Sequence, residues 1–213
     1  MIIVGAKGFA KELLQIISVD MGLADHQIVF FDNVSEGLTE KLFNRFVILK
    51  SFKQVETYLN SSNDKQFVLG LGQPKHRDTL YQQFVNLGCH PVNVFSKHCD
   101  VGSFDVKIGL GTTVLSGAII SNSVSIGIGC LIYYNSIITH DCEVGNFVEV
   151  SPGAKILGRT KIGHHTSLGA GCIILPDVTI GNYVIIGAGT VVTKDIPDNC
   201  TVVGVPGKII KQY

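Results

Sequence analysis

The sequence has no tryptophan and little charge, since only 16% of its 213 residues are Asp, Glu, Lys or Arg. The charges also balance, with 17 Lys and Arg against 17 Asp and Glu, so no basic surplus points to nucleic acid or an anionic membrane. No run of about 18 apolar residues is present, which argues against a membrane-spanning helix. The opening MIIVGAKGFA lacks the charged and apolar segments of a signal peptide, so we expect a cytoplasmic protein.

Cysteine pairs with metal-binding spacing are also missing. The six cysteines, at 89, 99, 130, 142, 172 and 200, form no CxxC pair and no Cys/His spacing typical of zinc. We therefore expect reduced thiols and no metal site. What the sequence does have is 46% hydrophobic residues and 24 glycines, enough for a sizeable core and many tight turns.

The first ninety-odd residues alternate between strand and helix patterns. MIIVG, QIVFFD and QFVLGLG predict short buried strands, whereas GFAKELLQIISV and PKHRDTLYQQFVNLG have the apolar spacing of helices. Strands alternating with helices favour a small parallel sheet with helical crossovers. We place this first domain at residues 1–95.

From about residue 100 the pattern becomes a six-residue repeat. Two phases of this repeat carry residues suited to a core, so we expect both to face inward. In the second of them, which starts at Thr112, every sixth residue is small or medium-sized. The first phase is an unbroken aliphatic series: Ile108, Val114, Ile120, Ile126, Ile132, Ile138, Val144, Val150, Ile156, Ile162, Leu168, Ile174, Ile180, Ile186 and Val192.

A longer period of 18 residues is superimposed on the hexapeptides. Glycines recur at 109, 127, 145, 163 and 181. Three six-residue sides predict one triangular coil, with each coil hydrogen-bonded to the next in continuous ladders. Residue i should then lie beside residue i+18, which gives contacts from the sequence alone.

These repeats resemble the hexapeptide-repeat acyltransferases, which fold as a left-handed parallel β-helix. The GVPGK element, Gly204 to Lys208, is similar to the family's C-terminal GVPAK segment, and IIVGAKGFAKELLQII resembles the opening of a sugar-modifying subgroup with a Rossmann-like N-terminal domain. That subgroup includes N-acetyltransferases of nucleotide-linked 4-amino-4,6-dideoxy sugars and sialic-acid O-acetyltransferase-type proteins. The resemblance implies an α/β nucleotide-sugar-binding domain at 1–95 and an acyl-CoA-binding, catalytic β-helix with a C-terminal tail at 96–213. It also implies a homotrimer with acetyl-CoA between adjacent β-helices.

A glycine-rich turn, GAKG, lies between the first strand and the first helix. Backbone N–H groups at such a turn, together with the helix dipole, suit a diphosphate, which makes Gly5, Lys7 and Gly8 candidate substrate-binding residues. Asp32 ends the next strand, where a carboxylate could meet a ribose or base. Gly72, in GLGQPKHR, could contribute to the same pocket. A tight turn that binds no ligand is the alternative reading.

His140 and Asp141, in IITHDC, lie in the phase that points outward from the coils. An imidazole accepts protons near neutral pH, and an adjacent carboxylate can fix its tautomer. A lone surface histidine is usually just solvated, and His164 occupies the same phase. The segment from His140 to Ala154 resembles the part of the family that carries the catalytic base, which implies that His140 is the base and Asp141 its orienting partner.

Gly158 lies one coil after His140, where the family's corresponding amide hydrogen-bonds the thioester carbonyl. The resemblance thus implies an oxyanion role, and a plain corner glycine is the alternative. Cys142 shares the inward phase with Ala118 and Ala154, so we expect packing and not nucleophilic chemistry.

Small residues 18 apart, Gly169-Ala170 and Gly187-Ala188, form a strip against which the pantetheine arm of CoA could lie. Lys208 could meet the CoA phosphates, or it could simply be solvated. Glu149 stands where the family often has a histidine, and we assign it to the substrate site.

The sequence and the resemblance therefore predict transfer of an acetyl group from acetyl-CoA to a UDP- or dTDP-linked amino sugar, a 4-amino-4,6-dideoxyhexose, by direct attack of the amine with a histidine as general base. A sialic-acid-type O-acetyltransferase is the first alternative, and a non-catalytic sugar-binding scaffold is the second.

Overall fold

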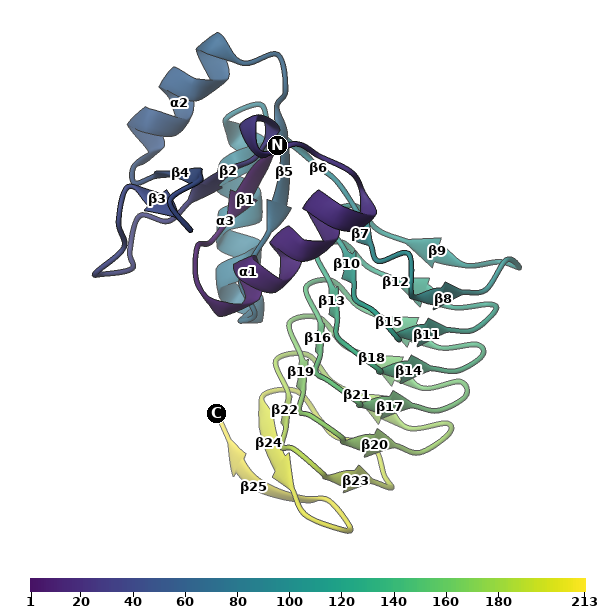
Figure 1. Cartoon of the computed structure of the whole chain (residues 1–213). Coiled ribbons are helices and arrows are strands. Elements are labelled where there is room, and N and C mark those ends of the chain that lie inside the picture. Colours follow the sequence, from purple (N-terminus) through teal and green to yellow (C-terminus); the bar gives the residue numbers. More distant parts are fainter. The chain divides into compact units, whose positions relative to one another are not determined.

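The computed structural model describes all residues from Met1 to Tyr213, and contacts between Cα atoms separate two compact units. The first unit comprises Met1–Gly72 and His76–Val94, and the second comprises Gln73–Lys75 and Phe95–Tyr213. Figure 1 shows both, and each is described by itself below.

The first unit is built on a six-stranded sheet in the order β3-β4-β2-β1-β5-β6. All neighbouring strands are parallel except β3 and β4, which form an antiparallel hairpin. The strands are β1 (Ile2–Val4), β2 (Val29–Phe31), β3 (Lys41–Leu42), β4 (Phe46–Leu49), β5 (Gln66–Leu69) and β6 (His90–Pro91). The helices are α1 (Gly8–Gln15), continued by a π-helical turn (Ile16–Asp20), a short 3-10 helix (Asp25–Gln27), α2 (Phe52–Ser61) and α3 (Pro74–Asn86).

Buried aromatic rings hold this sheet and its helices together. The Phe84 ring, from α3, lies 5.1 Å from Phe31 of β2 and 5.3 Å from Phe67 of β5, measured between ring centroids. All three side chains are buried. The predicted strand QIVFFD ends one residue early, at Phe31, because the Asp32 carboxylate accepts hydrogen bonds from the following turn.

The second unit is a β-helix of three parallel faces, and Figure 1 shows its coils stacked one upon another. The first face is an eight-stranded sheet: β7 (Val94–Phe95), β10 (Thr113–Val114), β13 (Leu131–Ile132), β16 (Glu149–Val150), β19 (Ser167–Leu168), β22 (Ile185–Ile186), β24 (Cys200–Val203) and β25 (Lys208–Gln212). The second face contains β8 (Asp100–Val101), β11 (Ile119–Ile120), β14 (Ile137–Ile138), β17 (Lys155–Ile156), β20 (Ile173–Ile174) and β23 (Val191–Val192). The third face contains β9 (Lys107–Ile108), β12 (Ser125–Ile126), β15 (Glu143–Val144), β18 (Lys161–Ile162) and β21 (Thr179–Ile180).

The predicted 18-residue register is confirmed. Ile119 pairs with Ile137, and Ile138 pairs with Ile156 one coil further. Ile120, Ile138, Ile156 and the other aliphatic positions are buried along the axis, with Ile108 at the first coil only partly covered. The small-residue phase is buried as well, so both inward phases form one continuous core.

Each corner of the coil requires one residue with a left-handed backbone. Several of these positions are glycine, but others are not, and they include Asn135, Asp141, Arg159, Asp177 and Tyr183. L-residues adopt this conformation at a cost, and here the ladders between coils fix it. The corners therefore display side chains at positions that the coil geometry sets rigidly.

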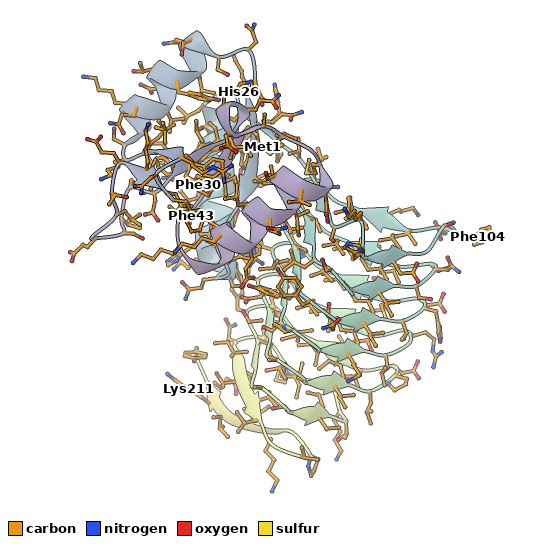
Figure 2. All side chains as sticks on the ribbon, viewed as in Figure 1. Met1, His26, Phe30, Phe43, Phe104 and Lys211 are labelled. Atoms are coloured by element: carbon orange, nitrogen blue, oxygen red, sulfur yellow. The ribbon has the colours of Figure 1, made fainter.

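The C-terminal tail returns as a strand antiparallel to the last coil. β25 pairs with β24, with Val203 opposite Lys208, and all of β25 is exposed. At the other end of the β-helix, Figure 2 shows the Phe104 side chain projecting away from the first coil, where it is 74% exposed. No helix in the chain is long and apolar enough to cross a membrane.

Candidate functional site

A cavity of about 310 Å³ opens in the first unit, at the carboxyl ends of β1, β2 and β5. Ligands of open parallel sheets bind at this edge. The structure brings together here five of the predicted substrate residues, Gly5, Lys7, Gly8, Asp32 and Gly72. The same cavity is lined by residues that the sequence patterns did not single out, namely Phe31, Asn33, Val34, Ser35 and Leu80, and by His76 of the GLGQPKHR segment.

Close approach between two strand ends explains why glycine occupies position 5. Gly5 has φ +112°, and a Cβ there would lie 2.6 Å from the Gly70 carbonyl oxygen. At Gly8, by contrast, a Cβ would meet nothing within 4 Å. The fold thus requires glycine at 5, whereas Gly8 leaves open space on the cavity wall.

The N-terminus of α1 has the electrostatic character of an anion site. Lys7, its N-cap residue, makes no side-chain capping bond, and the first turn contains no acidic residue. The positive end of the helix dipole and the exposed Lys7 both lie at the cavity. Backbone donors of this kind bind phosphate groups.

The Asp32 carboxylate joins the two loops that frame the cavity. One oxygen, Oδ2, accepts the Ala6 N–H at 3.2 Å, and Oδ1 accepts the Ser35 N–H at 2.9 Å. The sequence suggested that Asp32 meets a ribose or base, and in this structure its carboxylate is already engaged with backbone. The buried Arg77 guanidinium similarly donates to the Gly72 carbonyl oxygen and fixes the loop between β5 and α3, which also lines the cavity.

His140 and Asp141 form a hydrogen-bonded pair at the corner between the second and third faces. The distance from His140 Nδ1 to Asp141 Oδ2 is 2.7 Å, and both side chains are more than half exposed. A carboxylate on Nδ1 favours the tautomer in which Nδ1 carries the proton. Nε2 is then a free proton acceptor.

The ring of His140 leans over Gly158, one coil further along. A Cβ added to Gly158 would lie 2.6 Å from His140 Cε1 and 2.8 Å from Nε2. Gly158 is buried, and its N–H has no acceptor in the chain. Because the residue one coil beyond it is Pro176, no side chain there can accept that proton.

His164, in the same phase, is arranged in the opposite way. Its Nδ1 accepts the Asn146 N–H of the preceding coil at 2.8 Å, as Asn182 Oδ1 accepts the His164 N–H. His164 is therefore one step of a structural ladder of side chains at its corner. His140 makes no such bond to Asn122, and this difference separates a structural histidine from a candidate base.

Burial makes the Cys142 thiol a poor nucleophile. The side chain is fully buried, and this burial raises the pKa of Cys142 above the ordinary thiol value. Cys142 Sγ also contacts the Leu157 carbonyl oxygen at 3.4 Å. This buried position agrees with the packing role that we expected for Cys142.

Apart from Gly158, the residues predicted to bind CoA lie away from the His140 corner. Gly169-Ala170 and Gly187-Ala188 lie after β19 and β22, at the corner between the first and second faces. They stack closely, because a Cβ on Gly169 would lie 2.6 Å from the Ala188 nitrogen. Lys208 is exposed on β25, while Glu149 points outward from β16 on the first face. In one chain, neither Glu149 nor the strip lies at the His140 corner.

Comparisons with known proteins identify the two parts of the chain. The family model for the PglD N-terminal domain matches residues 1–84, and the model for bacterial transferase hexapeptide repeats matches residues 159–194. The chain is a hexapeptide-repeat sugar acyltransferase. Both the resemblance seen in the sequence and the predicted fold class are confirmed.

Solved structures similar to this acyltransferase match nearly its whole length. WeeI from Acinetobacter baumannii is 27% identical with a TM-score of 0.90, and the alignment covers 98% of each chain. The acetyltransferase domain of PglB from Neisseria gonorrhoeae, solved with acetyl coenzyme A, is 26% identical with a TM-score of 0.84 and the same coverage. Perosamine N-acetyltransferase from Caulobacter crescentus, a histidine-to-asparagine mutant solved with CoA and GDP-perosamine, is 25% identical with a TM-score of 0.85, covering 99% of this chain and 96% of that one. A search of curated protein sequences found no match.

Proposed function

We propose that this acyltransferase moves the acetyl group of acetyl-CoA to the amino group of a nucleotide-linked amino sugar. The main support is the His140 ring, which is held by Asp141 and turned over the unpartnered Gly158 N–H. The similar structures include an enzyme named as a perosamine N-acetyltransferase, solved with CoA and GDP-perosamine. This name favours nitrogen over oxygen as the acceptor atom.

In the proposed reaction, the neutral sugar amine attacks the thioester carbonyl carbon. His140 Nε2 takes the amine proton, while Asp141 holds Nδ1 and keeps the imidazole in the competent tautomer. The Gly158 N–H stabilises the oxyanion as the C–N bond forms. The C–S bond then breaks, and the proton passes from His140 to the departing CoA sulfur.

The first unit supplies the nucleotide site. The diphosphate lies at the N-terminus of α1, beside Lys7 and Gly8, and Gly5 and Gly72 allow the backbone to approach it. Asp32 binds the nucleoside and also holds together the two loops that surround it, through the Ala6 and Ser35 N–H groups. Acetyl-CoA lies along the strip of Gly169, Ala170, Gly187 and Ala188, within reach of Lys208, and its thioester meets Gly158 of a neighbouring chain.

A homotrimer would combine these parts. The His140 corner and the CoA strip border opposite sides of the second face, whose outward residues are Ile119, Ile137, Ile173 and Val191, together with the charged Asp100 and Lys155. Packing this mostly aliphatic face between chains would bring the base of one chain toward the strip of another. Glu149, on the first face, would then enter the site from a neighbouring chain. Sedimentation equilibrium at the mass of three chains is the expected result, and a monomeric active enzyme would contradict it.

Acceptor specificity tests the proposal. The protein is incubated with acetyl-CoA and a panel of UDP-, dTDP- and GDP-linked amino sugars, each beside its hydroxy counterpart, and thiol release is followed. We expect turnover with at least one amino sugar and none with the matched hydroxy sugar. Turnover of free sialic acid, with none of the nucleotide amino sugars, would instead establish the O-acetyltransferase alternative.

Gly8→Ala tests the nucleotide site separately. Because a Cβ at this position meets nothing in the chain, the substitution leaves packing unchanged and projects a methyl group from the cavity wall. We expect the sugar-nucleotide KM to rise roughly tenfold or more, with the acetyl-CoA KM unchanged. If the KM for the sugar nucleotide were the same in the variant and the wild type, the diphosphate would not bind at this turn.

A further inference from the structure

One column of corner residues runs directly beside the proposed base. Asp141, Arg159 and Asp177 are 18 residues apart, and each has a left-handed backbone, with φ of 58°, 62° and 64°. Their side chains therefore project from equivalent positions on three successive coils. The Arg159 N–H also donates to the His140 carbonyl oxygen at 3.1 Å, which fixes this register.

Arg159 is flanked by a carboxylate on each side. The coil before it carries Asp141 and the coil after it carries Asp177, so the repeat geometry offers the guanidinium two equivalent partners. Arg159 takes Asp177, through Nε to Oδ1 at 2.6 Å and a terminal nitrogen to Oδ2 at 2.8 Å. A bidentate pair of this kind fixes the orientation of the guanidinium as well as its distance.

Charge supports the same arrangement. The hydrogen bond that Arg159 donates to Asp177 is the largest cause that raises the pKa of Arg159, and the charge of Asp141 raises that pKa by a smaller amount. The Arg159 bond in turn lowers the pKa of Asp177. The cation therefore senses both carboxylates while it bonds to only one of them.

The choice of partner leaves Asp141 available to His140. The Asp141 carboxylate bonds to His140 Nδ1 at 2.7 Å, while the Arg159 guanidinium bonds to Asp177. If Arg159 turned to Asp141, a bidentate guanidinium would compete with Nδ1 for the carboxylate and orient its oxygens toward the arginine. The imidazole would then lose the partner that keeps Nε2 free to accept a proton.

We propose that Asp177 is a positioning residue that holds Arg159 away from Asp141 and so preserves the His140–Asp141 hydrogen bond. This inference rests on the proposed role of His140 as the base. It assigns a function to a pair of exposed residues that would otherwise pass as an ordinary surface ion pair.

The test compares Asp177→Asn with the double variant Asp177→Asn/Arg159→Ala. Asp177→Asn leaves Arg159 without its partner, and we expect kcat to fall about tenfold with little change in either KM. The double variant removes the competing guanidinium, so kcat should recover to within about twofold of the wild type. Glu143→Gln is the matched control, because it breaks the exposed Glu143–Lys161 pair of 2.9 Å on the third face and should leave kcat unchanged.

A second readout needs no turnover. Proton and ¹⁵N spectra of the ligand-free protein report whether His140 Nδ1–H donates to a carboxylate. That signature should be lost in Asp177→Asn and return in the double variant. If both variants keep the signature and share the same kcat loss, Asp177 acts through stability and the proposal is wrong. If the wild type turns over no amino sugar while the spectra change as described, the proposed function fails and the positioning role stands.

Discussion

At the scale of the residue, two histidines in one repeat phase have opposite orientations. His164 faces back to accept the Asn146 N–H, whereas His140 faces forward over Gly158. The coil provides the same backbone for both, so their side-chain partners decide which one is structural. The Asp141 carboxylate beside His140 is the distinguishing partner.

Alanine substitutions of the two histidines should therefore have opposite effects. His140→Ala should lower kcat roughly 10²-fold or more with an unchanged unfolding midpoint, because only the base is lost. His164→Ala should retain kcat and lower the free energy of unfolding by about 1 kcal/mol, because the Asn146 N–H loses its acceptor. Steady-state kinetics and urea unfolding of both variants decide the matter, and a full-activity His140→Ala enzyme would contradict the assignment.

Gly158→Ala should act through the His140 ring. Gly158 has no left-handed backbone, so alanine is compatible with its conformation, but the new Cβ would overlap the imidazole. We expect a kcat loss of roughly 10²-fold, close to that of His140→Ala, with both substrates still bound. Calorimetric binding and kcat measure the two effects, and a Gly158→Ala enzyme with wild-type kcat would show that the ring position is unimportant.

Some of these residues could be found from the sequence, and others could not. The 18-residue period places Gly158 beside His140, and the same period would also have paired Arg159 with Asp177. The direction in which the His140 ring leans depends on χ angles that no spacing encodes. The use of Asp32 as a bond between loops likewise needed the structure, because Ala6 and Ser35 are distant in sequence from each other.

At the scale of the element, the β-helix was predictable because one rule of packing repeats in every coil. Two inward phases and a corner glycine determine the register, and the pairs of i with i+18 follow. The β3–β4 hairpin was not predicted. Its turn contains Phe43 and Asn44, both with positive φ, and a phenylalanine there carries none of the glycine signal that marks such turns.

Substitution of a stacked corner glycine should destabilise this element. A Cβ on Gly163 would lie 2.5 Å from the Gly181 carbonyl carbon, where only backbone could move to relieve the overlap. We expect Gly163→Ala to lower the free energy of unfolding by about 1–3 kcal/mol. Thr179→Ala, an exposed position on the same face, is the control and should change it by less than about 0.5 kcal/mol. Urea unfolding measures both changes, and equal free energies of unfolding for the two variants would count against close stacking of the coils.

At the scale of the whole molecule, buried thiols link stability to pH. Burial raises the pKa of Cys172 to about 12, and it also raises the pKa values of Cys89 and Cys142. In the unfolded chain these thiols ionise near their ordinary value of about 8.5. Above that pH the unfolded state binds fewer protons than the folded state, so the free energy of unfolding must fall as pH rises.

The free energy of unfolding should therefore be insensitive to these thiols below about pH 8 and should decrease steadily between about pH 9 and 12. Cys172→Ala removes one ionising group and should make that decrease less steep. Chemical unfolding with a reductant present, at a series of pH values, measures both slopes. If the free energy of unfolding fell equally steeply with pH in Cys172→Ala and in the wild type, the pKa of Cys172 would not be raised by burial, and this account would be wrong.

Thiol release from acetyl-CoA, measured together with the N-acetylated sugar that forms, tests the central claim most directly. With the accepted nucleotide-linked amino sugar, the wild type should release one CoA thiol for each amide bond made. His140→Asn should bind both substrates and release thiol at least about 10²-fold more slowly. Tight binding of acetyl-CoA and every nucleotide-linked amino sugar tested, with no thiol released by the wild type, would contradict the account and favour a non-catalytic sugar-binding scaffold.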